Sequence, residues 1–306
     1  MKSLLEKEIS KKNAYKKEKL TKGYKIPIIS DTMFHVMLNN KKRKKYSAYL
    51  ISLSLKEDYE EILNNLELVK NKLDKDKYID QNKTVDYVCK INDDIVNIEM
   101  NNNVSKGELE RNLSYLFVLY KSNLIRGGSY DYSNVVQINI NNFTFKDNNN
   151  TVECYVFKNE EDIVFTNKIK FYNIYLPNIR KKLYSKEKLS ELERLLLVLN
   201  EESSKSKDIG KGYSIMEEYI TDAIDASEDD KIIGLYDKEM HEELKINTRL
   251  KESYENGVSE GISQGILQGA SDKQIEIAKN MLIKNMDIDT ISELTSLTKE
   301  KIENLK

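Results

Sequence analysis

Three polar residues, Asp86, Glu99 and Asn101, have the types and spacing that are most informative about chemistry. They lie within residues 84–103, where polar and apolar residues alternate along two runs separated by residues 92–94. Two carboxylates held on a rigid sheet suit a hard cation such as Mg²⁺, which prefers oxygen ligands and keeps several waters. Such an ion polarises a phosphoryl oxygen and lowers the pKa of a bound water, so no protein nucleophile is needed.

The alternation of residues 84–103 predicts a β-hairpin with one apolar face. Burial of both apolar sets together predicts that Cys89 pairs with Ile98, which places Asp86 opposite Asn101. A slip of one residue would put Asp86 and Glu99 on opposite faces of the sheet. The hydrophobic pattern and the proposed chemistry therefore require the same hairpin register.

The elements around this hairpin predict an α/β (α+β) fold, with a mixed sheet flanked by helices and a helical C-terminal half. Apolar periodicity predicts helices at residues 31–38, 46–55, 59–73 and about 106–124, and further strands at 135–145, 151–157 and 168–175. Residues beyond 185 are predicted to be helical, apart from a loop near residues 201–212.

The composition indicates one main globular domain with an appended segment, since the 306 residues are 39% hydrophobic and 33% charged. A net charge of −2 gives no global electrostatic argument for nucleic acid or for a membrane, so any basic surface must be local. Cys89 and Cys154 are too few for a disulfide framework or a cysteine-based zinc site and are predicted to be reduced core thiols. The absence of a signal peptide or a long apolar run predicts a soluble, cytoplasmic protein with no membrane partner.

At Asp86, Glu99 and Asn101 the sequence resembles the PD-(D/E)XK nuclease superfamily, and specifically its recombination-promoting nuclease (Rpn) and transposase family. The three residues match the pattern D…E-x-(K/Q/N). The resemblance extends to other segments: residues 30–34 are similar to the family's N-D-x-x-F-K opening, residues 110–115 to its helix after the hairpin, residues 136–140 to its next strand, and residues 254–306 to its Gly-spaced tail. Residues 27–180 and 245–306 are covered, and the fold implied is that of the restriction endonucleases.

The resemblance implies a role for each residue of the hairpin. Asp86 and Glu99 would ligate Mg²⁺ or Mn²⁺, with the backbone carbonyl of Met100 as a further ligand. Asn101 occupies the Lys or Gln position, which orients the attacking water. An amide can hydrogen-bond water but brings no positive charge to the transition state, so Asn101 predicts a lower rate than Lys.

Some of these residues have a second interpretation. Without the resemblance, Asp86 is an ordinary solvent-facing strand residue and Glu99 is its ion-pair neighbour across the strands. Asp31 is either a third acid of the metal site, as the family opening implies, or a residue that caps the helix beginning at Thr32. The sequence leaves both interpretations of Asp31 open.

Candidate contacts to nucleic acid lie outside the hairpin. Arg111 and Tyr115 are one helical turn apart and suit a phosphate, although Arg111 can equally pair with Glu108 or Glu110 on a solvated face. Gln137 and Asn139 share a strand face that could border the cleft or simply form a polar edge. A basic run between two predicted helices is either a phosphate-binding surface or a solvated loop: Lys41, Lys42, Arg43, Lys44 and Lys45.

The C-terminal tail places Gly257, Gly261, Gly265 and Gly269 at intervals of four, which is one stripe if the segment is helical. Each Gly costs about 1 kcal/mol in a helix relative to Ala, and close contact with a second helix would offset that, so we predict a homo-oligomer, a dimer, formed through this tail. Residues 275–285, 288–294 and 298–305 have helix-turn-helix spacing without a basic face, which favours docking or dimerisation over reading DNA. The predicted segments are a basic arm (1–25), the nuclease-like core (26–182), a helical extension (183–250) and the tail (251–306).

The resemblance and the hairpin together predict a divalent-metal-dependent DNA endonuclease that hydrolyses phosphodiester bonds, in recombination or on mobile-element DNA. The alternative is a catalytically weak or inactive nuclease-fold protein that binds DNA or a protein partner, for example in conflict between phage and host. Asn101 in the Lys position is the residue that keeps this alternative open.

Overall fold

The computed structural model describes residues 24–69, 86–103, 107–122, 133–145, 147–202 and 204–305. Residues 1–23 of the predicted basic arm lie outside the described residues. Within the described ranges, no helix combines the length and the apolar character that a membrane crossing requires.

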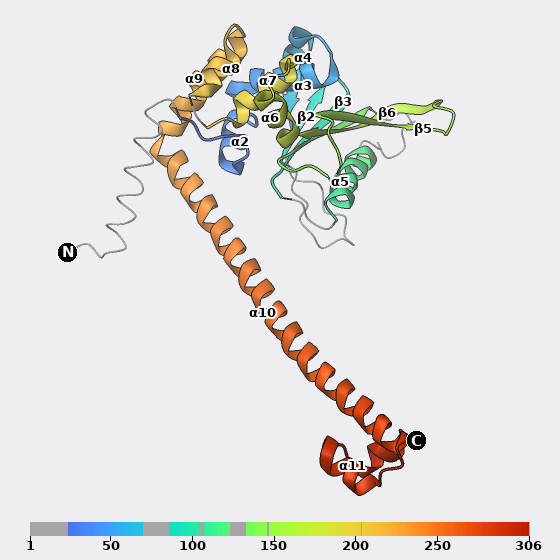
Figure 1. Ribbon diagram of the computed structural model, residues 1–306. Helices are drawn as coiled ribbons and strands as arrows, with labels where there is room; N and C mark the ends of the chain where they lie inside the picture. The colour runs from blue at the N-terminus through green and yellow to red at the C-terminus, as the bar shows by residue number, and fades with distance from the viewer. Residues whose placement is uncertain are drawn as a thin grey trace, which may run out of the picture. The chain divides into compact units, whose positions relative to one another are not determined.

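Helices and strands are mixed in the first part of the chain, and from residue 176 onward the described elements are all helices (Figure 1). The helices are α2 (Asp31–Met37), η1 (Lys41–Arg43), α3 (Lys44–Leu55), α4 (Tyr59–Asn65), α5 (Glu108–Ser122), α6 (Leu176–Tyr184), α7 (Glu191–Asn200), α8 (Lys205–Gly210), α9 (Ser214–Glu228), α10 (Asp230–Ile283), α11 (Ile288–Thr295) and α12 (Lys299–Glu303). The strands are β1 (Leu66–Leu68), β2 (Tyr87–Ile91), β3 (Asp94–Asn101), β4 (Val135–Asn141), β5 (Val152–Lys158) and β6 (Val164–Tyr175).

The described strands form one mixed, six-stranded sheet in the order β1-β2-β3-β4-β6-β5. The central strands β3, β4 and β6 are parallel, whereas β1, β2 and β5 add antiparallel pairs at the two sides. The α5 crossover links β3 to the parallel β4, as a parallel pair requires. The predicted α/β class, with a mixed sheet and a helical C-terminal half, is confirmed.

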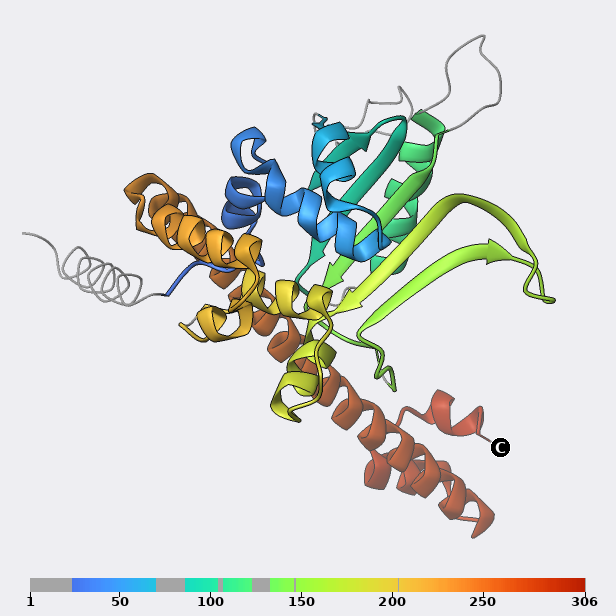
Figure 2. The same ribbon diagram turned by 90° about the horizontal axis from the view of Figure 1, so that it is seen from above.

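Helices cover both faces of this sheet (Figure 2). On one face Cys89, Ile98 and Leu196 belong to the large core that α2, α3, α7 and α9 build against the strands. On the other face α5 packs through Leu116 and Leu119. The sheet is therefore buried on both sides at its centre, and polar residues on the α5 face lie in a confined space.

The β2–β3 hairpin forms as predicted, but the predicted register is wrong by two residues. Cys89 pairs with Val96, and Tyr87 pairs with Ile98. The cause is a tight two-residue turn, in which Asn92 adopts a left-handed conformation with φ 55°. Because a shift of two residues preserves the faces, the same side chains still point the same way.

Three further expectations need correction. The helix predicted at 59–73 ends at Asn65, and β1 follows it directly. The loop predicted at 201–212 contains the short helix α8. Cys89 is buried, but Cys154 is exposed on the outer strand β5 and is not a core thiol.

The described chain divides into two compact units, residues up to Glu239 and residues from Met240 onward. In the first unit α7 begins with a capping box, in which Ser190 accepts a hydrogen bond from the backbone of Glu193 and Glu193 accepts one in return. In the second unit α11, α12 and the end of α10 share a small core around Ala278 and Ile291.

Candidate functional site

The two candidate acids face each other across the β2–β3 hairpin. In the observed register, one residue beyond the Tyr87–Ile98 pair, Asp86 comes opposite Glu99 instead of opposite Asn101 as predicted. The Asp86 carboxylate accepts a hydrogen bond of 2.9 Å from the backbone N–H of Met100, which ties it to β3. The structure therefore brings the two carboxylates together on the face that α5 covers.

Burial makes this pair of carboxylates difficult to ionise together. Glu99 is only 2% exposed and Asp86 is half-buried. Burial and the nearby charge of Asp86 raise the pKa of Glu99 to about 8. Burial also raises the pKa of Asp86, while its hydrogen bond from Met100 and the charge of Arg111 oppose that change. A pair with this electrostatic character favours a positive charge placed between its members.

Arg111 approaches this acidic pair from the first turn of α5. Its Nη2 donates a 2.9 Å hydrogen bond to Oδ1 of Asn101 and also contacts the carboxylate of Glu108. The Asn101 amide donates to Oδ1 of Asn141 at 2.9 Å. Arg111 does form an ion pair with Glu108, which was the alternative to a phosphate contact. This ion pair lies beside Asn101 and not on a solvated face away from the acids.

A ladder of buried amides continues from Glu99 across the sheet. Asn97 donates to Glu99 at 3.0 Å, and on β4 Gln137 donates to Asn139 at 2.9 Å. Asn139 in turn donates to the carbonyl of Tyr172 at 3.0 Å, which fixes the orientation of the chain of amides. Gln137 is fully buried, so the prediction that it contacts nucleic acid is wrong: α5 covers the strand face that was expected to border a cleft.

Of the amides on β4, Gln137 and Asn139 were predicted to share a strand face, but Asn141 was missed as a partner of the site, although the spacing of the three gave a signal. Asn139 pairs in register with Glu99, and Asn141 pairs with Asn101. Alternate polar residues within an otherwise apolar central strand are unusual, because a parallel strand is commonly buried on both faces. Such alternation indicates polar side chains that form hydrogen bonds with each other across the sheet.

Asp31 lies at the start of α2, and its charge raises the pKa of Asp86. Burial and the nearby charge of Glu239 raise the pKa of Asp31 itself. The helix is capped by Ser30, whose side chain accepts from the backbone of Met33, so the capping interpretation of Asp31 is wrong. Glu239 completes the cap, since its carboxylate accepts hydrogen bonds from the backbone N–H of Asp31 at 2.9 Å and from Ser30 Oγ at 2.8 Å. Asp31 therefore adds a third acid near the hairpin.

The basic run is largely paired within the protein. Arg43 lies 3.9 Å from Asp222, and Lys45 Nζ lies 2.5 Å from Glu218, both acids being on α9. Lys44 Nζ donates to the backbone carbonyl of Leu63 at 2.8 Å. These three side chains stabilise helix packing, which does not fit the predicted phosphate-binding surface, whereas the side chains of Lys41 and Lys42 remain exposed.

The oxygen atoms at this site suit a hard cation that is bound by only a few protein groups. Asp86 and Glu99 offer carboxylate oxygens, and the N–H and C=O of Met100 face the same strand edge, where Asp86 lies. In the described part of the chain, no group of three or more His, Cys, Asp or Glu is placed to hold a metal ion. A cation here would therefore keep several waters, as Mg²⁺ does.

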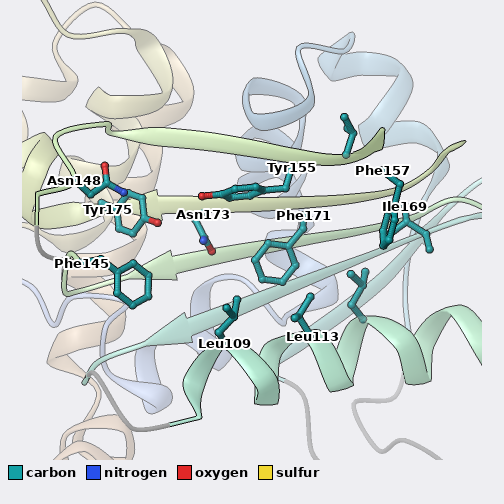
Figure 3. A pocket seen from close by; sticks show the side chains of 12 residues that line it. Leu109, Leu113, Phe145, Asn148, Tyr155, Phe157, Ile169, Phe171, Asn173 and Tyr175 are labelled. Carbon is teal, nitrogen blue, oxygen red and sulfur yellow. The ribbon is translucent and has the colours of Figure 1, made fainter. Parts of the chain in front are cut away.

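A separate cavity of about 390 Å³ lies on the other side of α5 (Figure 3). Leu109 and Leu113 of α5 face Phe171 of β6 and Tyr155 of β5 across it. Its lining is mainly apolar and includes neither candidate acid. Tyr115, in contrast, lies on the Arg111 side of the helix, where the charges of Arg111 and Glu99 influence its pKa, which burial raises.

Comparison with known proteins identifies two matching families. Residues 28–253 match the family described as PD-(D/E)XK nuclease family transposase, and residues 272–306 match the C-terminal HTH domain of the Rpn/YhgA-like nuclease family. No curated protein and no solved structure matches the chain. The first match covers well over half of the chain and contains the whole hairpin. The chain therefore belongs to the PD-(D/E)XK nuclease family of transposases and ends in a helix-turn-helix domain of the Rpn/YhgA-like type.

Proposed function

We propose that this protein is a divalent-metal-dependent endonuclease that hydrolyses phosphodiester bonds of DNA. The observation that carries the proposal is the pair of carboxylates formed by the half-buried Asp86 and the buried Glu99, which face each other on the sheet. Membership of the PD-(D/E)XK nuclease family supports the reaction class.

Asp86 and Glu99 would hold Mg²⁺ or Mn²⁺, with the Met100 carbonyl as a further ligand and Asp31 as a third acid whose charge acts on Asp86. A bound divalent cation supplies a water of lowered pKa and neutralises charge on a phosphoryl oxygen. The protein keeps the two carboxylates rigid, because β3 is a central strand and the Met100 N–H holds Asp86. Rigid ligands reduce the reorganisation that the reaction requires.

DNA is the proposed substrate because the chain combines a nuclease-family core with a helix-turn-helix domain. Arg111 and Tyr115 are the proposed phosphate contacts nearest to the acids, and the Arg111 side chain is about half exposed, at 48%. Lys41 and Lys42 are proposed as weaker, sequence-independent contacts. This distribution predicts tethering by the C-terminal domain and cleavage by the core.

We further propose that the protein associates as a dimer through α10. In the second unit, Tyr254, Val258, Ile262 and Ile266 are all exposed and recur every four residues beside the Gly stripe. A helix that exposes this apolar row is stabilised when a second helix covers it.

A nuclease-fold protein that binds without cutting is the second candidate. The observation that favours it is the Asn101 side chain, whose two ends are both engaged by other protein groups. In that case DNA binding would persist and no variant of the acids would change it.

Incubation of the purified full-length protein with supercoiled plasmid and Mg²⁺ or Mn²⁺ tests the proposal. We expect nicking, and we expect Asp86→Asn and Glu99→Gln to reduce its rate by about a hundredfold or more, because each removes a charged ligand. Asp93→Asn is the matched control, since Asp93 is exposed in the turn of the same hairpin. Nicking that is equal in all four proteins would assign the activity to another site or to a contaminant.

A further inference from the structure

The side chain of Asn101, which occupies the Lys position of the superfamily pattern, is used inside the protein. It is 2% exposed, its Oδ1 accepts a hydrogen bond from Arg111, and its Nδ2 donates to Asn141. A group that orients an attacking water must present a donor or acceptor to that water. The Oδ1 of Asn101 instead holds a neighbouring cation, and its Nδ2 is held by Asn141.

That cation, Arg111, is both anchored and accessible. Asn101 and Glu108 hold it on one side, and Glu108 is itself nearly buried, with 7% of its side chain exposed. Both of these contacts use Nη2, so the Nη1 and Nε donors have no acceptor among the residues that the structure describes. Arginine carries five donors in a planar fork that suits two oxygens of a phosphate.

We propose that Arg111 supplies the positive charge that the superfamily pattern places on a lysine, and that Asn101 is the residue that positions it. This inference rests on the proposed nuclease function and deepens it. Two N–H groups of Arg111 would bind a non-bridging oxygen of the scissile phosphate. Water oxygen forms a bond to phosphorus as the bond to the leaving oxygen breaks; one water proton passes to solvent and the leaving oxygen takes up a proton. Arg111 stays protonated throughout.

The position on α5 explains how the chain tolerates an amide on β3. An arginine reaches further than a lysine and remains charged when partly buried, because its guanidinium is not deprotonated in proteins. From the first turn of α5 its side chain reaches the Lys position of β3, as the 2.9 Å bond to Asn101 shows. The site thus has two acids and one cation, divided among two strands and a helix.

A set of substitutions tests the assignment by rate and by affinity. We expect Arg111→Ala to lower kcat for plasmid nicking by about 100-fold to 1,000-fold, as loss of one transition-state donor does, and to change the Kd for duplex DNA much less. Arg111→Lys should restore part of kcat. Lys90→Ala removes an exposed cation from the neighbouring strand β2 and should leave kcat within about twofold.

A double-mutant cycle separates a positioning role of Asn101 from a direct one. If Asn101 acts through Arg111, Asn101→Ala lowers kcat in the wild-type background but not in the Arg111→Ala background. The double variant Asn101→Lys with Arg111→Ala should recover activity, because it returns the charge to β3. Unchanged thermal unfolding and an unchanged Mn²⁺ shift in Tm verify that each variant remains folded and retains its acids.

Three results overturn the assignment in distinguishable ways. If the wild-type protein nicks DNA and Arg111→Ala nicks it equally fast, Arg111 is not the charge and the nuclease function stands. If the effects of Asn101→Ala and Arg111→Ala simply multiply, Asn101 does not act through Arg111 and its positioning role fails. If the wild-type protein cuts no DNA with either cation, the proposed function and the role of Arg111 both fail.

Discussion

Asp86 and Glu99 differ from surface acids in that their ionisation depends on nearby positive charge. Both are withdrawn from water, and ionisation of one opposes ionisation of the other. Arg111, whose charge lowers the pKa of both acids, makes its hydrogen bonds to Asn101 and Glu108. Two carboxylates in this setting suit a cation that comes from solution.

The raised pKa of Glu99 predicts how cation affinity depends on pH. Burial raises this pKa to about 8, so below pH 8 the ion-free protein holds a proton that the cation must displace. We expect the Mn²⁺ affinity to rise by up to about tenfold per pH unit up to pH 8 and to level off above it. Isothermal titration calorimetry in buffers of different ionisation enthalpy measures both the affinity and the released proton.

Glu99→Gln provides the control for that measurement, because a glutamine has no proton to lose in this range. Its residual affinity should not depend on pH through Glu99. A wild-type affinity that is the same at pH 6 and pH 8, with no proton released, contradicts the electrostatic account of Glu99.

At the scale of elements, the sequence predicted the hairpin but not its register. Alternation of apolar residues determined which side chains share a face, and that part is confirmed. The pairing depended on the backbone of the turn, where Asn92 takes a positive φ that residue types alone do not specify. The Arg111–Asn101 bond was also not predictable, since it depends on how α5 returns across the sheet.

The helix α10 carries the prediction about association. A Cβ added at Gly257, Gly261, Gly265 or Gly269 would meet nothing within 4 Å in the chain itself. Gly261→Leu with Gly265→Leu should therefore preserve the folded chain and improve helix propensity. If close helix contact forms a dimer, the same pair of substitutions should convert a species of twice 35.7 kDa to one of 35.7 kDa.

Analytical ultracentrifugation measures that change of mass. Gly234→Leu is the matched control, because Gly234 lies on the same helix outside the stripe and also has open space around it. A wild-type protein that sediments as a monomer, or a double variant that stays dimeric, contradicts association through the stripe.

At the scale of the whole molecule, the chain combines a PD-(D/E)XK core with a helix-turn-helix domain in a separate compact unit. The fold class, the helical C-terminal half and the helix-turn-helix spacing of the tail followed from periodicity. Pairing of the basic run with acids of α9 did not, because Arg43 and Asp222 are far apart in sequence. Long-range ion pairs of this kind leave no local pattern, which is why the run was interpreted as a candidate DNA surface.

We propose that Asp86 and Glu99 together hold one divalent cation, and anomalous diffraction from crystals of the full-length protein soaked in Mn²⁺ would locate it. We expect one anomalous peak between the two carboxylates, within about 2.0–2.4 Å of an oxygen of each, and no such peak in Glu99→Gln crystals. A map without a peak between these carboxylates, or a peak that persists unchanged in Glu99→Gln, would show that the two acids do not form the cation site.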